Sequence, residues 1–296
     1  MQILTLAAVL TALAATPLAA QQVPSAPAPD SAAQAQTATD QAPLAQEMWA
    51  VLDFDALMPI LRDEALAQAD SMAAEMFPRG GTGHFREVVG QIHEPARLTE
   101  LLQGALAQAL TRSDPALIER ALAFYGGDLG QRMIGIEIDA RRTLIDPDAD
   151  SAAQADADAA FSRGTPRSAA IQRLIERGNL IEPNVAGAMN ASLAFSQGFA
   201  AGEGHTMPMS ETDQLREVWS QEPQIRADTE SWLRGYLMLA YSPLSDDDLA
   251  DYTEFAGAPE GQALSDALFA AFDTLFQQTS RDMGLAAAAE LTGREL

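Results

Sequence analysis

The residues of this chain that could bind a metal ion are concentrated in one acidic stretch. The segment from Asp146 to Asp158 reads DPDADSAAQADAD and places aspartates at its first, third and fifth positions, as a calcium-binding loop does. Such a loop needs glycine at its sixth position and glutamate at its twelfth, where this chain has Ser151 and Ala157. We therefore interpret the segment as an acidic linker and leave open whether it binds calcium.

The residues that could do acid–base or nucleophilic chemistry form no recognisable motif. His84, His93 and His205 are the only histidines, and none has a second histidine at helical ligand spacing. We expect His93 and His205 to lie in loops. Cysteine and lysine are absent, which excludes thiol nucleophiles, Schiff bases and the lysine of a phosphate-binding loop. We accordingly assign no catalytic, cofactor-binding or metal residue and expect no cofactor.

The aromatic residues offer a different kind of site. Five of them lie close together in the second half of the chain: Trp219, Trp232, Tyr236, Tyr241 and Tyr252. Aromatic side chains often anchor binding partners. They also fill the cores of domains that have few large aliphatic residues, and this second interpretation is the one we favour.

The charge of the chain limits its partners. Its 296 residues carry 42 acids and 18 bases, a formal net charge of −24. Nucleic acid and anionic lipid surfaces repel such a chain, so we expect it to bind neither. We interpret the charge as a solvated acidic surface, with a cationic partner as the alternative.

The first residues are typical of an exported protein. An apolar run from Ile3 to Ala15 is followed by a proline and by small residues at Ala19 and Ala20, which predicts a signal peptide over residues 1–20. Residues 21–44 are rich in Gln, Ala, Pro, Ser and Thr, a composition that predicts a disordered leader. We therefore expect a periplasmic or secreted protein with no transmembrane anchor after cleavage.

Beyond Leu44 the apolar residues recur every three or four positions. One such stripe predicts a helix over about residues 55–76 and another a helix over about 183–202, and no alternating pattern predicts a sheet. The fold class that we predict is all-α.

Two similar stretches indicate an internal duplication. FYGGDLGQ begins at Phe124 and FAGAPEGQ begins at Phe255, an offset of 131 (255 minus 124). At the same offset LQGAL, from Leu102, falls on LRGYL, from Leu233, and at 130 Arg86-Glu-Val falls on Arg216-Glu-Val. We predict two tandem copies of a helical unit, over 45–165 and 166–296, packed end to end or face to face.

Each predicted copy is built on an αα-hairpin. Ser113 and Ser245 are expected to cap the helix that ends at the phenylalanine, and the small residues that follow permit a tight reversal. Gly130 and Gly261 would lie on the first turn of the returning helix, where a side chain would hold the two helices apart.

The corner motif resembles an exported bacterial family, domain of unknown function 2059. In that family a helix ends in Phe-Tyr and is followed by small residues, often a proline, and then x-Gly at the start of the next helix. Phe255-Ala-Gly-Ala-Pro-Glu-Gly-Gln is similar to this pattern, and Phe124-Tyr-Gly-Gly-Asp-Leu-Gly-Gln keeps the Phe-Tyr but lacks the proline. The resemblance covers about forty residues in each half. It implies an all-α fold and export to the periplasm, and it implies no activity.

These observations favour a non-enzymatic exported protein that binds a protein or peptide of the periplasm or envelope, or has a structural role there. Two alternatives stay open. One is a hydrolase-type enzyme whose site is assembled from Asp, Glu, Ser or His across the fold. The other is a small-ligand carrier with an apolar cavity between the copies. The sequence leaves the oligomeric state unassigned.

Overall fold

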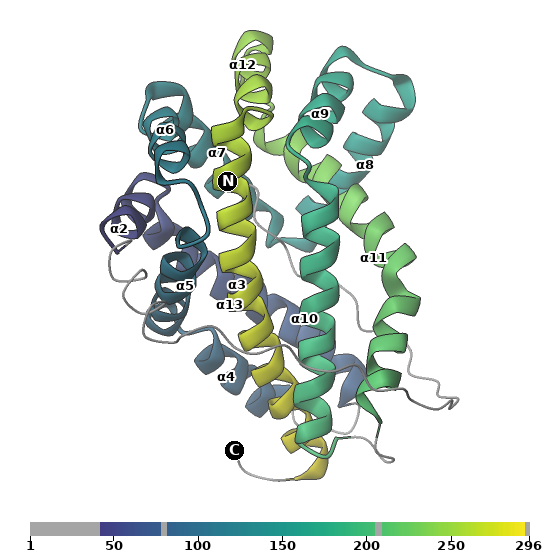
Figure 1. Cartoon of the computed structure of the whole chain (residues 1–296). Helices are drawn as coiled ribbons and strands as arrows, with labels where there is room; N and C mark the ends of the chain where they lie inside the picture. Colours follow the sequence, from purple (N-terminus) through teal and green to yellow (C-terminus); the bar gives the residue numbers. More distant parts are fainter. Residues whose placement is uncertain (1–41, 78–81, 205–208, 294–296) are drawn as a thin grey trace.

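The computed structural model describes residues 42–77, 82–204 and 209–293, and all twelve elements in these ranges are α-helices (Figure 1). The all-α prediction is therefore confirmed. The predicted signal peptide and residues 21–41 of the predicted leader lie outside the described residues. The first helix begins at Ala42, so the folded part starts slightly earlier than the predicted boundary at residue 44.

The helices follow one another with short connections. Their bounds are α2 (Ala42–Val51), α3 (Phe54–Met76), α4 (Thr82–Ile92), α5 (Pro95–Leu110), α6 (Pro115–Tyr125), α7 (Asp128–Leu144), α8 (Pro147–Arg163), α9 (Pro166–Arg177), α10 (Ile181–Ala201), α11 (Glu211–Ala240), α12 (Asp246–Ala256) and α13 (Pro259–Thr292).

Prolines and short polar side chains determine where many helices begin. Five of the described helices begin with a proline, at a position where the N–H group that proline lacks would have no partner within the helix. Ser245 caps α12 as predicted, since its hydroxyl accepts a hydrogen bond from the Asp248 amide. The prediction for Ser113 is wrong. Asp114 caps α6 by accepting from the Ala116 amide, because Pro115 occupies the first helical position and Asp114 directly precedes it.

The two predicted corners exist and are close-packed. α6 ends at Tyr125 and α12 at Ala256, one residue after the phenylalanine in each case. A Cβ atom on Gly130 would overlap the backbone of Phe124 and Tyr125. A Cβ atom on Gly261 would likewise overlap the backbone of Phe255 and Ala256. Both glycines therefore let the returning helix touch the end of the preceding one.

A second glycine contact lies at the centre of the molecule, where α10 and α13 run side by side (Figure 1). A Cβ atom on Gly198 of α10 would overlap the Arg281 backbone of α13. One on Gly284 of α13 would lie 2.7 Å from the Phe199 nitrogen of α10. Small residues thus bring these two helix backbones into contact, and neither contact is predicted by the sequence analysis.

The predicted halves share one core. The Phe124 and Phe255 rings stack with centroids 3.8 Å apart and planes 5° from parallel. α5 packs on α13, and α11 packs on α7 and α8, so each half contributes helices that cover the other. Buried residues of both halves, from α2, α3, α5, α6, α7, α9, α11, α12 and α13, form one continuous apolar cluster. Helices of the segments 45–165 and 166–296 therefore pack against each other.

Candidate functional site

The acidic stretch from Asp146 to Asp158 is helical. It forms most of α8, and the Asp146 side chain caps that helix by accepting a hydrogen bond from the Asp148 amide, 2.9 Å away. The interpretation as a linker is therefore corrected to a helix start, because proline at 147 and acids in the first turn favour a helix N-terminus. Within the described ranges, no group of three or more His, Asp or Glu side chains is placed to hold a metal ion.

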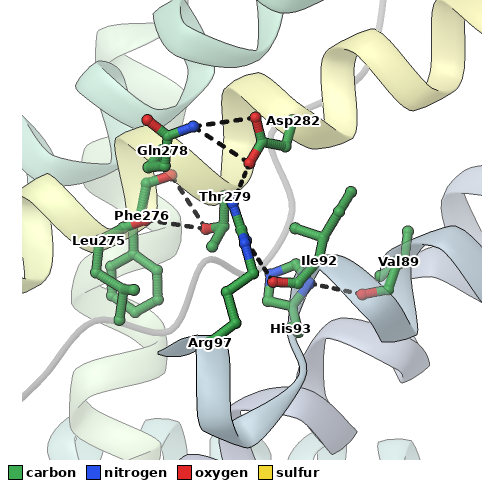
Figure 2. Close-up of polar contacts among 9 residues, drawn as sticks. All are labelled: Val89, Ile92, His93, Arg97, Leu275, Phe276, Gln278, Thr279 and Asp282. Carbon is green, nitrogen blue, oxygen red and sulfur yellow. Dashed lines mark hydrogen bonds and ion pairs between the residues drawn. The ribbon is translucent and has the colours of Figure 1, made fainter. Parts of the chain in front are cut away.

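His93 lies between α4 and α5, as predicted, and is buried against α13 (Figure 2). Its Nδ1 lies 3.0 Å from the Val89 carbonyl oxygen. Arg97 crosses the same junction. Its guanidinium donates to the Ile92 carbonyl and to Asp282 of α13, both at 2.5 Å. Burial lowers the pKa of His93, and the nearby Arg97 charge lowers it further. Through Arg97 this cluster links the α4–α5 junction to α13.

The other two histidines, His84 and His205, are not part of this cluster. His84 is exposed on α4, and His205 lies outside the described residues.

A polar network that the sequence analysis missed runs through the core. Arg141 of α7 makes a two-point contact with Glu64 of α3, at 3.1 and 2.6 Å. Glu137, one turn earlier on α7, accepts a hydrogen bond from the Tyr241 hydroxyl at 2.7 Å. The Tyr236 hydroxyl donates to the Glu137 carbonyl. Buried charges are tolerated where they are paired in this way.

The network shifts the pKa of its buried tyrosine and arginine. Burial raises the pKa of Tyr241 well above its ordinary value, and the Glu137 charge raises it further. Burial disfavours the charged form of Arg141, but the Glu64 carboxylate outweighs that effect and raises the guanidinium pKa. Tyr241 and Arg141 therefore do not titrate near neutral pH, and the network is suited to holding helices together rather than to proton transfer.

A small cavity lies beside the network. Tyr125 and Tyr252, whose hydroxyls are 3.1 Å apart, line it together with Leu180, Ser265 and apolar residues of α12 and α13. Its volume is about 40 Å³. Ligand pockets usually enclose roughly 300–1,000 Å³, so this cavity is of a size for a few water molecules.

The most distinctive surface feature is an apolar face on α11. Among the described residues, Leu215, Trp219 and Leu291 are the only exposed large hydrophobic residues. Leu215 is 44% exposed and Trp219 is 65% exposed, and they lie one helical turn apart, which places them on the same side of the helix. We call this pair the α11 face.

The α11 face corrects one prediction. Tyr236, Tyr241 and Tyr252 are buried, and Trp232 is half-buried and stacked on Tyr236. These four residues are therefore part of the core, as predicted. Trp219 is not a core residue. The neighbouring Val218 is the residue that α11 buries, and since successive helical residues point about 100° apart, Trp219 is directed away from the core.

The position of the α11 face follows from its helix neighbours. Ser210 directly precedes α11 and caps it, since its hydroxyl accepts a hydrogen bond from the Asp213 amide. The first half of α11 lies along α10. The contact with α8 is made further on, where Gln154 approaches Ser231 and Gly235. In Figure 1, α11 stands at the edge of the molecule beside α10.

None of the helices in the described ranges combines the length and the hydrophobicity that crossing a membrane requires. In the comparisons with known proteins, no family model, curated protein or solved structure matches the chain.

Proposed function

We propose that this chain is an exported, non-enzymatic protein that binds another protein or a peptide through the α11 face. The observation that carries the proposal is the exposure of Leu215 and Trp219 one turn apart on α11. Tryptophan is strongly enriched among the residues that dominate binding energy at protein interfaces. Elsewhere in the described part, large apolar side chains are covered, apart from Leu291 near the end of α13.

The other features of the molecule favour binding over the two alternatives. The buried network of Glu64, Glu137 and Arg141 pairs its charges internally, which suits a structural role better than that of a hydrolase site. The cavity of about 40 Å³ beside Tyr125 is too small for the ligand of a carrier.

We further propose export to the periplasm, an origin of the two halves by duplication, and membership of the domain of unknown function 2059 family. The apolar run from Ile3 supports export. The duplication is supported by the two matched corners, where Gln131 donates to the Tyr125 and Val51 carbonyls and Gln262 to the Ala256 and Arg177 carbonyls. The corner motif alone supports the family assignment.

A pull-down with the purified protein tests the binding function. We expect the wild-type chain to retain one or more proteins reproducibly from a cell-envelope extract of the producing cells, and Trp219→Ala to retain them at least about tenfold less well. Leu291→Ala is the matched control, since it also truncates an exposed apolar residue. The absence of a reproducible partner, or equal retention by all three proteins, would refute the proposal.

A further inference from the structure

The structure contains an example of how a face like that of α11 can be covered. α4, in the first half, packs on α3 with one side and on α13 with another. Its Phe85 and Val89 are fully buried, in a cluster with Met283, Ala286 and Ala287 of α13. Small residues on α13 thus form part of the surface that covers the apolar side of α4, together with residues of α3 and α10.

The first half of α11 occupies the corresponding place in the second half. In the register of the shared Arg-Glu-Val sequence, Leu215 and Trp219 stand where Phe85 and Val89 stand (85 plus 130 and 89 plus 130). α10 lies along α11 as α3 lies along α4. Phe85 and Val89 are buried, whereas Leu215 and Trp219 are exposed.

The difference arises from a break in one helix. α13 continues unbroken over 34 residues after its corner, and its far part reaches α4. The helix after the first corner, α7, ends after 17 residues, and the chain turns at Asp146-Pro147 into α8. α8 then packs on the second half of α11, near Gly235. No described helix covers the α11 face as α13 covers α4.

From this comparison we infer the class of partner: the α11 face receives a helix of another protein that presents a stripe of alanine or glycine and carries basic residues beside the stripe. The inference deepens the proposed function and rests on it. The small-residue stripe follows from Ala286 and Ala287, which α13 buries in the same cluster as Phe85 and Val89.

The basic residues that we infer for the partner helix follow from the negative charge around the α11 face. Glu211 lies one turn before Leu215, and Glu217 lies between Leu215 and Trp219. The nearby Arg216 and Arg226 are already paired with acids of α11. The chain as a whole carries a net charge of −24. Two copies of this chain would repel each other at such a charge, so a basic partner is favoured over self-association.

Synthetic helices test the inference. We would titrate the full chain by calorimetry with three alanine-based peptides of about 20 residues, long enough to be helical in isolation. The first has an alanine stripe flanked by arginines, the second replaces the arginines by glutamates, and the third replaces the alanine stripe by phenylalanines. The first peptide should bind at least about tenfold more tightly than the other two, and Trp219→Ala should lose that binding while Leu291→Ala keeps it.

Each possible result of this titration either supports or overturns the inferred partner class. Tighter binding of the glutamate or the phenylalanine peptide, binding unaffected by Trp219→Ala, or no binding of any peptide would overturn the inference. So would a concentration-dependent dimer that Trp219→Ala abolishes, because the occupant would then be a second copy of this chain. If the pull-down still yields a Trp219-dependent partner in these cases, the proposed function stands and only the partner class is wrong. If the pull-down itself fails, the function is wrong.

Discussion

At the scale of single residues, His93 should make the stability of the protein depend on pH. Its folded-state pKa lies below 6.5, the ordinary value, because it is buried and close to Arg97. Between the two values the unfolded chain binds more protons at this site, so the free energy of unfolding rises with pH there. The stabilisation is complete above pH 6.5 and is lost as the pH falls through the window. We expect urea unfolding of the wild type to show this slope and His93→Gln to show a smaller one.

His84→Gln is the matched control for this experiment, because His84 is exposed on α4, the helix that directly precedes His93. Its pH profile should follow that of the wild type. A profile of His93→Gln that runs parallel to the wild-type profile from pH 5 to 7 would show that His93 titrates alike in both states, and would contradict its burial against α13.

The roles of individual residues were predictable only in part. The burial of Tyr236, Tyr241 and Tyr252 follows from their spacing among aliphatic residues. The exposure of Trp219 does not, because Val218 and Trp219 are adjacent and the sequence alone does not say which of them faces α10. The charged network had a usable signal: Glu137 lies within the apolar stripe formed by Met133, Ile134 and Ile138, where an acid requires a partner.

At the scale of the elements, the glycine corners should be intolerant of any side chain. Gly130→Ala should lower the free energy of unfolding by about 1–3 kcal/mol, because its methyl group would overlap the backbone of Phe124 and Tyr125. Gly135→Ala lies one turn later on the same helix, where an added Cβ atom meets nothing within 4 Å. It should leave stability unchanged or raise it by about 0.5–1 kcal/mol. Chemical denaturation of the two variants measures the difference.

The second corner provides an internal check. Gly261→Ala, and more severely Gly261→Leu, should also destabilise the protein, since the added atoms would overlap the Phe255 backbone. Equal midpoints for Gly130→Ala, Gly135→Ala and the wild type would mean that the corners are not close-packed.

The corners were predictable because they depend on local sequence: an aromatic residue, small residues and a glycine at a fixed spacing. The lengths of the helices that follow the corners could not be predicted in this way. α13 runs to Thr292, while its counterpart is broken before Pro147, and the acidic composition there concealed the helix α8. The contact of Gly198 with α13 was also missed, because its two sides lie far apart in the sequence.

At the scale of the whole molecule, the way in which the two halves combine was beyond the sequence. Their contact depends on interactions such as the stacking of Phe124 on Phe255, which no local pattern encodes. The α11 face is a property of this scale as well. It is open because α8 packs further along α11, and a helix in the place that α13 takes on α4 would cover it.

The most direct measurement of the central claim is a site-specific cross-link in living cells. A photoreactive benzoylphenylalanine would replace Trp219 in the full chain, and a second protein would carry it in place of Leu291. The account predicts that light produces an adduct with another protein from position 219 and little or none from position 291. Adducts that map only to this chain, equal adducts from both positions, or no adduct from position 219 would contradict it.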